Sequence, residues 1–136
     1  MIVFGGNLFG KSDIEKGKAR KGTIIDVEDN LFLAAKKDDR PSPDDFLNHS
    51  CDPNLWLKDA VTLIARRNIK KDEEITADYG TRVSRKNWVM KCSCGAKKCR
   101  KIITSNDWKL KKLQTIYKNH FSPYLNRKIK RINMEV

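Results

Sequence analysis

Apolar positions in the first 80 residues fall in short runs separated by turns, a pattern typical of strands. A run over residues 2–4 ends at Gly5-Gly6, which interrupts it as a turn would. The segment TIIDVEDNLFLAA, residues 23–35, reads as two strands around a hairpin-type turn. The run 61–65 suits a buried strand, and Ile75 opens a short partner strand. The pattern predicts a mainly β fold.

Helical structure is expected in two places. Residues 13–23 are poor in apolar side chains and predict a short helical turn followed by a surface loop, and the proline-broken segment 36–45 predicts another loop. After residue 104, Ser105 or Asn106 can begin one helix and Ser122-Pro123 a second. The apolar stripes of these two expected helices are Leu110, Leu113 and Tyr117, and Leu125, Ile129 and Ile132.

The composition predicts one intracellular domain. A chain of 136 residues with 39% apolar residues can bury a core, and no apolar run approaches the roughly 18 residues of a membrane span. The first residues lack the basic start and longer apolar run of a signal peptide, so we expect a cytoplasmic or nuclear protein that is not secreted. Disulfides are therefore disfavoured.

Basic residues outnumber acidic ones by 29 to 17, which gives a formal charge of +12. Such a charge favours polyanionic surroundings, including nucleic acid. Much of the excess follows Ser84, but no RNP-like or helix-turn-helix pattern accompanies it. A solvated basic face is the favoured interpretation, and direct nucleic-acid binding is the alternative.

The four cysteines predict a metal site. Cys92, Cys94 and Cys99 form the pattern C-x-C-x4-C, and Cys51 lies some forty residues earlier beside His49. Structural zinc takes four ligands in a closed tetrahedron, so we expect Cys51 to complete a site of four thiolates. Free buried thiols are the alternative, but clustered basic residues would lower the pKa of such thiols and make them reactive.

Three motifs in order carry a resemblance. The segment NHSCDPN (48–54) is followed by a strand, then by DEEITADYG (72–80), and then by the three clustered cysteines. This arrangement resembles the SET-domain protein-lysine methyltransferases with a post-SET zinc motif, over roughly residues 24–103. The segments ITSNDW and HFSPYL are similar to the tail of small bacterial-type members.

The resemblance implies a compact SET-type β-clip fold with a knot-like core and short C-terminal helices. We expect a SET-like domain over residues 1–90, a post-SET zinc loop over 91–103 and a helical tail over 104–136. It also implies S-adenosylmethionine as methyl donor, a protein substrate with a target lysine, and zinc as a structural metal. The substrate could itself be associated with nucleic acid.

The same resemblance assigns roles to single residues. Asn48 and His49 are the expected contacts to S-adenosylmethionine, and Tyr79 is the expected catalytic tyrosine. Methyl transfer needs a neutral amine held in line with the sulfonium methyl, and a phenol can orient that amine without acting as a base. The alternative for His49 is a satisfied core histidine, and Tyr79, considered without the family, reads equally as a packing residue.

Other polar and aromatic clusters suggest no second chemistry. Asp72, Glu73 and Glu74 lie in or beside an expected turn, with Asp78 close by, so a solvated turn is favoured over paired-carboxylate hydrolysis. The turn former Asp52-Pro53-Asn54 is expected to hold Asn48 and Cys51 in place. Three tryptophans are expected to pack rather than to form a methyl-lysine cage, namely Trp56, Trp88 and Trp108.

The chain departs from the family pattern at its start. Gly5-Gly6 is either a degenerate form of the glycine turn that cradles the cofactor, or the end of the second strand of a domain whose first strand is missing. We expect the second alternative, because few residues separate Gly5 from Asn48.

Three smaller departures follow along the chain. Asp45 stands where many members have Arg, and Ala77 stands where Phe or Tyr often tunes the number of methyl groups added. Arg100-Lys101 replaces the usual Arg-Gly after the last cysteine.

Three functions remain open at this point. The leading hypothesis is a protein-lysine methyltransferase, and the runner-up is a catalytically weakened SET-like module that binds a protein or nucleic-acid partner. A zinc-ribbon-like nucleic-acid binder is third, because it would ordinarily carry four cysteines as two local pairs.

Overall fold

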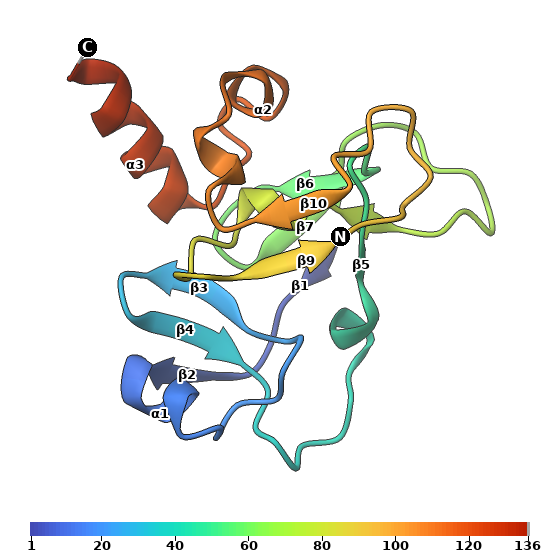
Figure 1. Ribbon diagram of the computed structural model, residues 1–136. Coiled ribbons are helices and arrows are strands. Elements are labelled where there is room, and N and C mark those ends of the chain that lie inside the picture. The colour runs from blue at the N-terminus through green and yellow to red at the C-terminus, as the bar shows by residue number, and fades with distance from the viewer. Residues whose placement is uncertain (136) are drawn as a thin grey trace.

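The computed structural model describes residues 1–135 and consists of several small sheets with short helices (Figure 1). In that view the sheet β2-β4-β3 lies below, and the sheet β1-β7-β6, the hairpin β9–β10 and two helices lie above it. A fourth, two-stranded sheet joins β5 and β8. None of the helices among these residues is long and apolar enough to cross a membrane. The mainly β fold predicted from the apolar pattern is confirmed.

The lower sheet contains the hairpin expected in residues 23–35. Strand β3 (Ile25–Glu28) and strand β4 (Leu31–Ala34) pair antiparallel, and Asn30 between them has a φ of 57°. Strand β2 (Asn7–Gly10) pairs with the other edge of β4 and runs into the short helix α1 (Lys11–Glu15). Asparagine tolerates the left-handed conformation of Asn30 better than most residues would, which explains the tight turn between β3 and β4.

The second sheet begins at the N-terminal strand. Strand β1 (Ile2–Val3) pairs with β7 (Thr62–Ala65), and β7 pairs on its other side with β6 (Leu55–Leu57). Between β1 and β2 the backbone passes so close to β4 that a Cβ on Gly6 would lie 2.4 Å from the carbonyl oxygen of Ala34. Only glycine fits there, so Gly5-Gly6 is the chain break expected from the sequence.

The main core lies between these sheets. Its buried members are apolar side chains from β1 to β8, namely Phe4, Ile25, Leu47, Leu55, Leu57, Leu63 and Ala77. Strand β1 forms one edge of its sheet, and the side chain of Val3 is 54% exposed. The strand expected at residue 61 is confirmed, but Ile75 opens no partner for it. Strand β8 (Thr76–Ala77) instead pairs with β5 (Asn48–His49), in parallel.

The tail differs from the expected pair of helices in its first half. A single turn of 3-10 helix, Asp107–Lys109, precedes helix α2 (Lys111–Ile116), and the backbone is extended at Leu110 between them. Asp107 is bound by Arg100 and Thr104, and the Trp108 indole donates to the Ser105 carbonyl, so these bonds hold the tight turn. Leu110 is therefore half exposed instead of joining the buried stripe.

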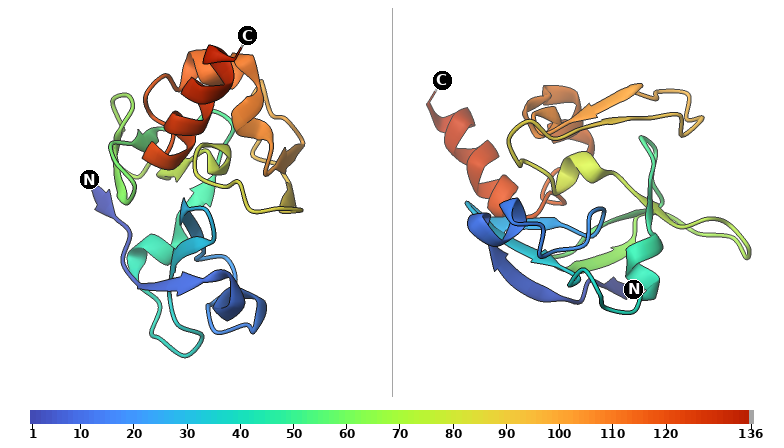
Figure 2. Two further views of the ribbon diagram at one scale, coloured as in Figure 1. Left: turned by 90° about the vertical axis from the view of Figure 1, so that its left-hand side faces the viewer. Right: turned by 60° about the horizontal axis from the view of Figure 1, so that its bottom comes forward.

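Helix α3 (Pro123–Met134) begins as expected, because the Ser122 side chain accepts a bond from the Leu125 backbone N–H and Pro123 occupies the first turn. Leu125 is buried, whereas Ile132 at the far end is 37% exposed. Figure 2 shows α2 and α3 together on the same end of the molecule.

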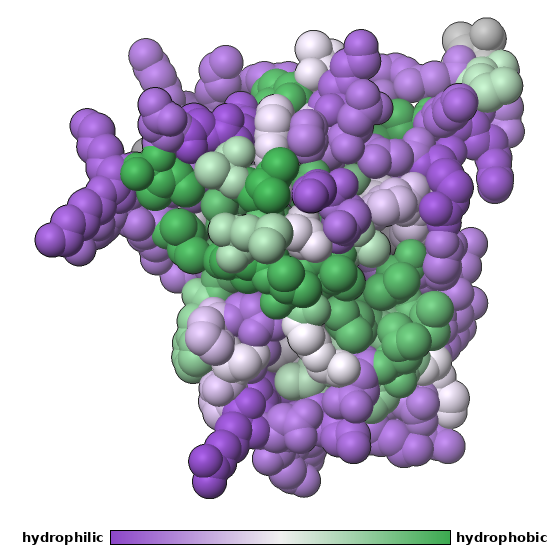
Figure 3. All heavy atoms as spheres, turned by 180° about the vertical axis from the view of Figure 1, so that it is seen from behind, coloured by the Kyte–Doolittle hydropathy of each residue, from purple (hydrophilic) through white to green (hydrophobic). Residues whose placement is uncertain are grey.

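A second core joins the tail to the sheets. Its buried members are Trp108, Leu113, Tyr117, Phe121, Tyr124 and Leu125. Trp56 of β6 stacks on His120, with ring centroids 3.6 Å apart and planes 3° from parallel. Trp56 and Trp108 therefore pack, as expected. On the opposite face from Figure 1, apolar side chains form a band across the middle of a mostly hydrophilic surface (Figure 3).

Candidate functional site

The four cysteines converge, as the sequence predicted. Hairpin β9–β10, formed by Val89–Lys91 and Ile102–Thr104, carries the loop with three of them to the segment that follows β5. The ligand atoms of Cys51, Cys92, Cys94 and Cys99 all lie within 4.8 Å of one another. The Sγ atom of Cys92 is 3.9 Å from that of Cys51 and 3.7 Å from that of Cys99.

These distances fit a tetrahedral metal site. Four sulfur atoms at a Zn–S distance of about 2.3 Å from one ion lie about 3.8 Å apart, whereas the bond of a disulfide is about 2.05 Å long. Backbone N–H groups already point at the sulfur atoms, from Arg100 to Cys51 at 3.4 Å and from Lys101 to Cys99 at 3.4 Å. The donor set and its spacing therefore suit zinc.

Two of the thiols differ in acidity. Burial would raise the pKa of Cys94, but the backbone N–H groups of Cys51 and Ala96 outweigh burial and lower it to about 6. Burial raises the pKa of Cys51 to about 12. Cys94 thus ionises readily and Cys51 resists ionisation, and a divalent cation would allow four thiolates to share so small a space.

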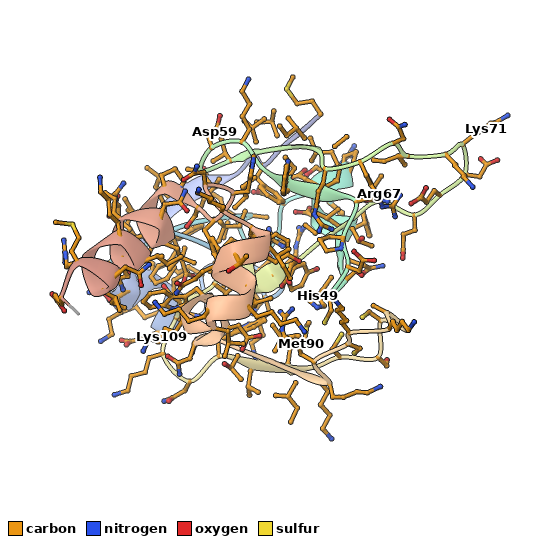
Figure 4. All side chains as sticks on the ribbon, turned by 90° about the horizontal axis from the view of Figure 1, so that it is seen from above. His49, Asp59, Arg67, Lys71, Met90 and Lys109 are labelled. Atoms are coloured by element: carbon orange, nitrogen blue, oxygen red, sulfur yellow. The ribbon has the colours of Figure 1, made fainter. Side chains whose placement is uncertain are left out.

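His49 connects this cluster to the segment around Tyr79. Its Nδ1 accepts the backbone N–H of Tyr79 at 3.0 Å, and its Nε2 lies 3.3 Å from the Sγ of Cys51. Because burial lowers the pKa of His49, the ring is neutral, and the accepting Nδ1 leaves the proton on Nε2, facing the sulfur. Figure 4 labels His49 on β5 and Met90 on β9, the strand that leads into the cysteine loop.

The Tyr79 side chain lies on the other side of the same joint. Its hydroxyl donates to the backbone carbonyl of Leu47, and its ring contacts His49 edge to face. Burial raises the pKa of Tyr79, so the phenol stays protonated at neutral pH. Because the hydroxyl donates its hydrogen bond to the Leu47 carbonyl, the phenol oxygen keeps lone pairs that can accept a hydrogen bond from a second group.

Arg82 is an unexpected neighbour of Tyr79. Its guanidinium carbon lies 4.5 Å from the centroid of the Tyr79 ring and 4.7 Å from that of Phe4. The residue is 8% exposed, and its Nε has no hydrogen-bond partner among the described residues. Burial lowers the pKa of Arg82. No pattern in the sequence points to this contact, because an arginine three residues after a tyrosine has no recognisable signature.

Asn48 and Asn54 hold the segment before Tyr79. The Asn48 amide donates to Glu74 at 3.0 Å on the surface. Asn54 is buried, donates to the Glu74 carbonyl at 2.8 Å and accepts the Thr76 N–H at 2.9 Å. Glu73 is not simply solvated, as the turn interpretation had it: bonds from Arg67, the Lys70 N–H and Asn54 lower its pKa to about 2.

Asp78 is the polar centre that the sequence did not identify. It is 1% exposed and accepts two bonds from the Arg100 guanidinium, each 2.8 Å long. Tyr117 and the Gly80 N–H also donate to it. Arg100 continues to Asp107 at 2.9 Å. Arg100 therefore connects the segments of Asp78 and Asp107 to the end of the cysteine loop.

The remaining family departures have local explanations. Asp45 accepts bonds from Arg20 and from the backbone N–H of Ser42, so it anchors the loop before β5. Ala77 is 2% exposed and belongs to the main core, so a larger side chain there would disturb packing before it narrowed any pocket. Lys101 has a φ of 66°, a conformation that glycine adopts without strain.

Comparison with known proteins agrees with this geometry. The family model described as "SET domain" matches residues 8–80, which is more than half of the chain. The histone-lysine N-methyltransferase trithorax of Drosophila virilis is 34% identical over 87 residues, 59% of this chain and 2% of that protein. The H3 lysine-9 specific histone-lysine N-methyltransferase KMT1 of Fusarium mangiferae is 35% identical over 102 residues, 61% of this chain and 27% of that protein.

The chain thus spans only a small part of the length of these relatives. The matched region includes both the asparagine-histidine motif and Tyr79, and the four-cysteine cluster that follows it is consistent with a post-SET zinc motif. This chain belongs to the SET domain family and is related to the histone-lysine N-methyltransferases.

Proposed function

We propose that the chain transfers the methyl group of S-adenosylmethionine to a lysine side chain of a protein, with histones as the first substrates to test. The observation that carries the proposal is the joint between Tyr79 and the asparagine-histidine motif. The Tyr79 backbone donates to His49, and its hydroxyl donates to Leu47, one residue before Asn48. The names of the relatives support the reaction class.

In this proposal S-adenosylmethionine supplies an activated methyl group, and the residues of the chain supply orientation. Asn48 and His49 bind the cofactor, and Tyr79 accepts a hydrogen bond from the neutral target amine through the lone pairs that its bond to Leu47 leaves free. The raised pKa of Tyr79 keeps its hydroxyl from acting as a base. Cys51, Cys92, Cys94 and Cys99 hold zinc, which stabilises the joint and takes no part in the reaction.

Tyr79→Phe tests the catalytic assignment. The variant loses one hydroxyl, so we expect it to fold and bind zinc as the wild type does, while methyl transfer from labelled S-adenosylmethionine to core histones or a cell extract falls by at least about tenfold. Tyr124→Phe is the matched control, because its hydroxyl bonds Asp29, at the hairpin turn of the lower sheet. Equal rates and products for Tyr79→Phe and wild type would make Tyr79 a structural residue.

Calorimetry tests cofactor binding separately. If the first cofactor-cradling strand is missing, S-adenosylmethionine binds weakly, and the exposed edge of β1 favours pairing between copies. Micromolar binding would instead identify Gly5-Gly6 as the cofactor turn. If no methyl transfer is measured at saturating S-adenosylmethionine, the result would favour the alternative of a catalytically weakened SET-like module that binds a partner.

A further inference from the structure

The net positive charge of the chain comes from its second part. Residues 85–136 contain 15 Lys and Arg residues and two acidic ones, Asp107 and Glu135, whereas residues 1–84 contain 14 basic and 15 acidic residues. Asp107 is buried against Arg100. Residues 85–136 therefore carry a net charge of +13, of which the post-SET loop and the helical tail supply +11, while residues 1–84 carry −1.

Ion pairs neutralise only part of this charge. Arg85, Arg100, Arg127 and Lys128 pair with acids of the first 84 residues. The other eleven basic residues of this region form no ion pair among residues 1–135. They are Lys86, Lys91, Lys97, Lys98, Lys101, Lys109, Lys111, Lys112, Lys118, Lys130 and Arg131.

Three of the unpaired lysines line one groove. A groove of about 800 Å³ runs between α2 and α3, with Lys111 and Lys118 from one side and Lys130 from the other. The remaining polar lining is uncharged apart from Arg127 and consists of Gln114, Thr115, Asn119, Asn126 and Asn133. No acidic side chain lines it. Of its two apolar lining residues, Phe121 is 2% exposed and Ile129 is partly buried against the second core.

The groove is separate from the methyl-transfer site. In Figure 1, α3 lies at the upper left and α2 at the upper centre, whereas the loop between β9 and β10, which carries three of the cysteines, lies at the upper right. In Figure 4, Lys109 beside α2 is well apart from His49. The groove belongs to neither the expected cofactor site nor the zinc site, so its charge needs another explanation.

We propose that the α2–α3 groove binds the phosphate backbone of double-stranded DNA without reading its sequence. Duplex DNA carries about one negative charge per 1.7 Å of its axis, and the twelve residues of α3 span roughly 18 Å. A protein chain or a membrane surface presents acidic groups less densely, and membrane binding also needs an apolar face. Lysines interleaved with amides and a hydroxyl suit phosphate contacts.

Neutralisation of the groove lysines tests the proposal. The variant Lys111→Gln, Lys118→Gln, Lys130→Gln removes three positive charges, and the control Lys16→Gln, Lys21→Gln, Lys37→Gln removes three exposed charges from the N-terminal part of the chain. Binding of the full chain to a fluorescent 20-base-pair duplex is measured by anisotropy at several salt concentrations. Three lost phosphate contacts should reduce the slope of log K against log salt by about 2.7, while the control keeps the wild-type slope.

Three results would overturn the proposal. Equal losses for the groove and control variants would show that net charge alone attracts DNA. Tighter binding to double-stranded RNA, to an acidic peptide or to vesicles with anionic lipid than to the duplex would identify another partner. A wild type that binds no duplex at low salt would remove it altogether. Methylation of a free peptide by the groove variant, measured in parallel, separates this outcome from failure of the proposed catalysis.

Discussion

A few single residues have a strained backbone or buried polar atoms without hydrogen-bond partners among the described residues. Lys101 has a left-handed backbone, and Arg82 and Asp26 are buried with polar atoms that no described residue satisfies. Lys101 directly follows Arg100, and Arg82 lies three residues after Tyr79. Such positions are where a small substitution has a calculable effect, because one physical cause dominates.

Replacing Lys101 by glycine should stabilise the protein. A left-handed conformation costs a residue with a Cβ roughly 1–2 kcal/mol, and the added flexibility of glycine in the unfolded chain returns about 0.5–1 kcal/mol of that. We expect Lys101→Gly to raise the free energy of unfolding by about 0.5–1 kcal/mol in urea titrations. Lys98→Gly is the matched control, because Lys98 is not among the residues with positive φ. This variant should lower the free energy of unfolding. Destabilisation of both variants would contradict the assignment.

Asp26 should make the stability depend on pH. Burial raises its pKa, against opposing bonds from Ser84 and the charge of Arg85. Its folded pKa therefore exceeds its unfolded pKa, so the folded state binds more protons between the two values and stability rises as pH falls through that window. Asp26→Asn removes this term.

The advantage of Asp26→Asn over the wild type should thus be greatest near pH 7 and should shrink towards pH 4. Denaturant midpoints of both proteins, measured over this range, check the difference. A difference that is independent of pH would mean that Asp26 titrates normally.

Strands β5 and β8 are so short that other contacts must help to hold them together. Each has two residues, so their parallel ladder contributes few bonds. Side chains supply the rest: Asn54 ties the loop after β5 to the segment before β8, and His49 reaches across to the Tyr79 backbone. Asp78, directly after β8, adds Arg100 and Tyr117.

Breaking the Asp78 joint should cost much of the stability. Asp78→Asn leaves the half-buried Arg100 with only Asp107, and removal of one partner from a buried pair costs about 3–5 kcal/mol. We expect about 3 kcal/mol, because Asp107 remains. Tyr117→Phe removes one neutral hydroxyl from the same carboxylate and should cost about 1 kcal/mol. Similar losses in the two variants, measured by chemical unfolding, would show that the Arg100 contact is weak.

The tail and the loop that carries the clustered cysteines hold the sheets together. Arg127 pairs with Glu28, Tyr124 bonds Asp29, and the Ser122 N–H donates to the Thr81 carbonyl. The cysteine cluster joins the segment after β5 to the loop between β9 and β10. The molecule is therefore stapled at two places between segments that are distant in sequence.

Zinc content tests the second staple. We expect one zinc per chain and a large loss of thermal stability with a chelator, because apparent binding free energies of structural zinc are about 10–16 kcal/mol. Cys51→Ser should destabilise as much as Cys94→Ser, although Cys51 lies outside the cluster in sequence. Ser50→Ala is the matched control next to it. Elemental analysis that finds no zinc in protein purified without chelator would remove the site.

How far the sequence predicts this molecule depends on the range of the interactions. Local patterns found the hairpin at residues 23–35, the cap at Ser122 and the four cysteines, because each depends on neighbouring residues or on a ligand count. The pairing of β8 with β5 was missed, since two-residue strands carry no periodicity. The single helix expected after Ser105 was wrong, because Arg100 and Thr104 fix the turn at Asp107. Buried Asp78 and Arg82 depend on partners brought together only by folding.

The bond from the Tyr79 backbone to the His49 imidazole has one more consequence. Most protected amides in a protein are held by a backbone carbonyl, but this hydrogen can exchange with deuterium only when an imidazole ring moves away. The exchange rate of the Tyr79 amide therefore measures how often the contact between the Tyr79 segment and the asparagine-histidine motif opens. Because that ring also lies against Cys51, the exchange rate of the same amide also depends on whether the cysteine cluster is intact, and it can be measured without any substrate.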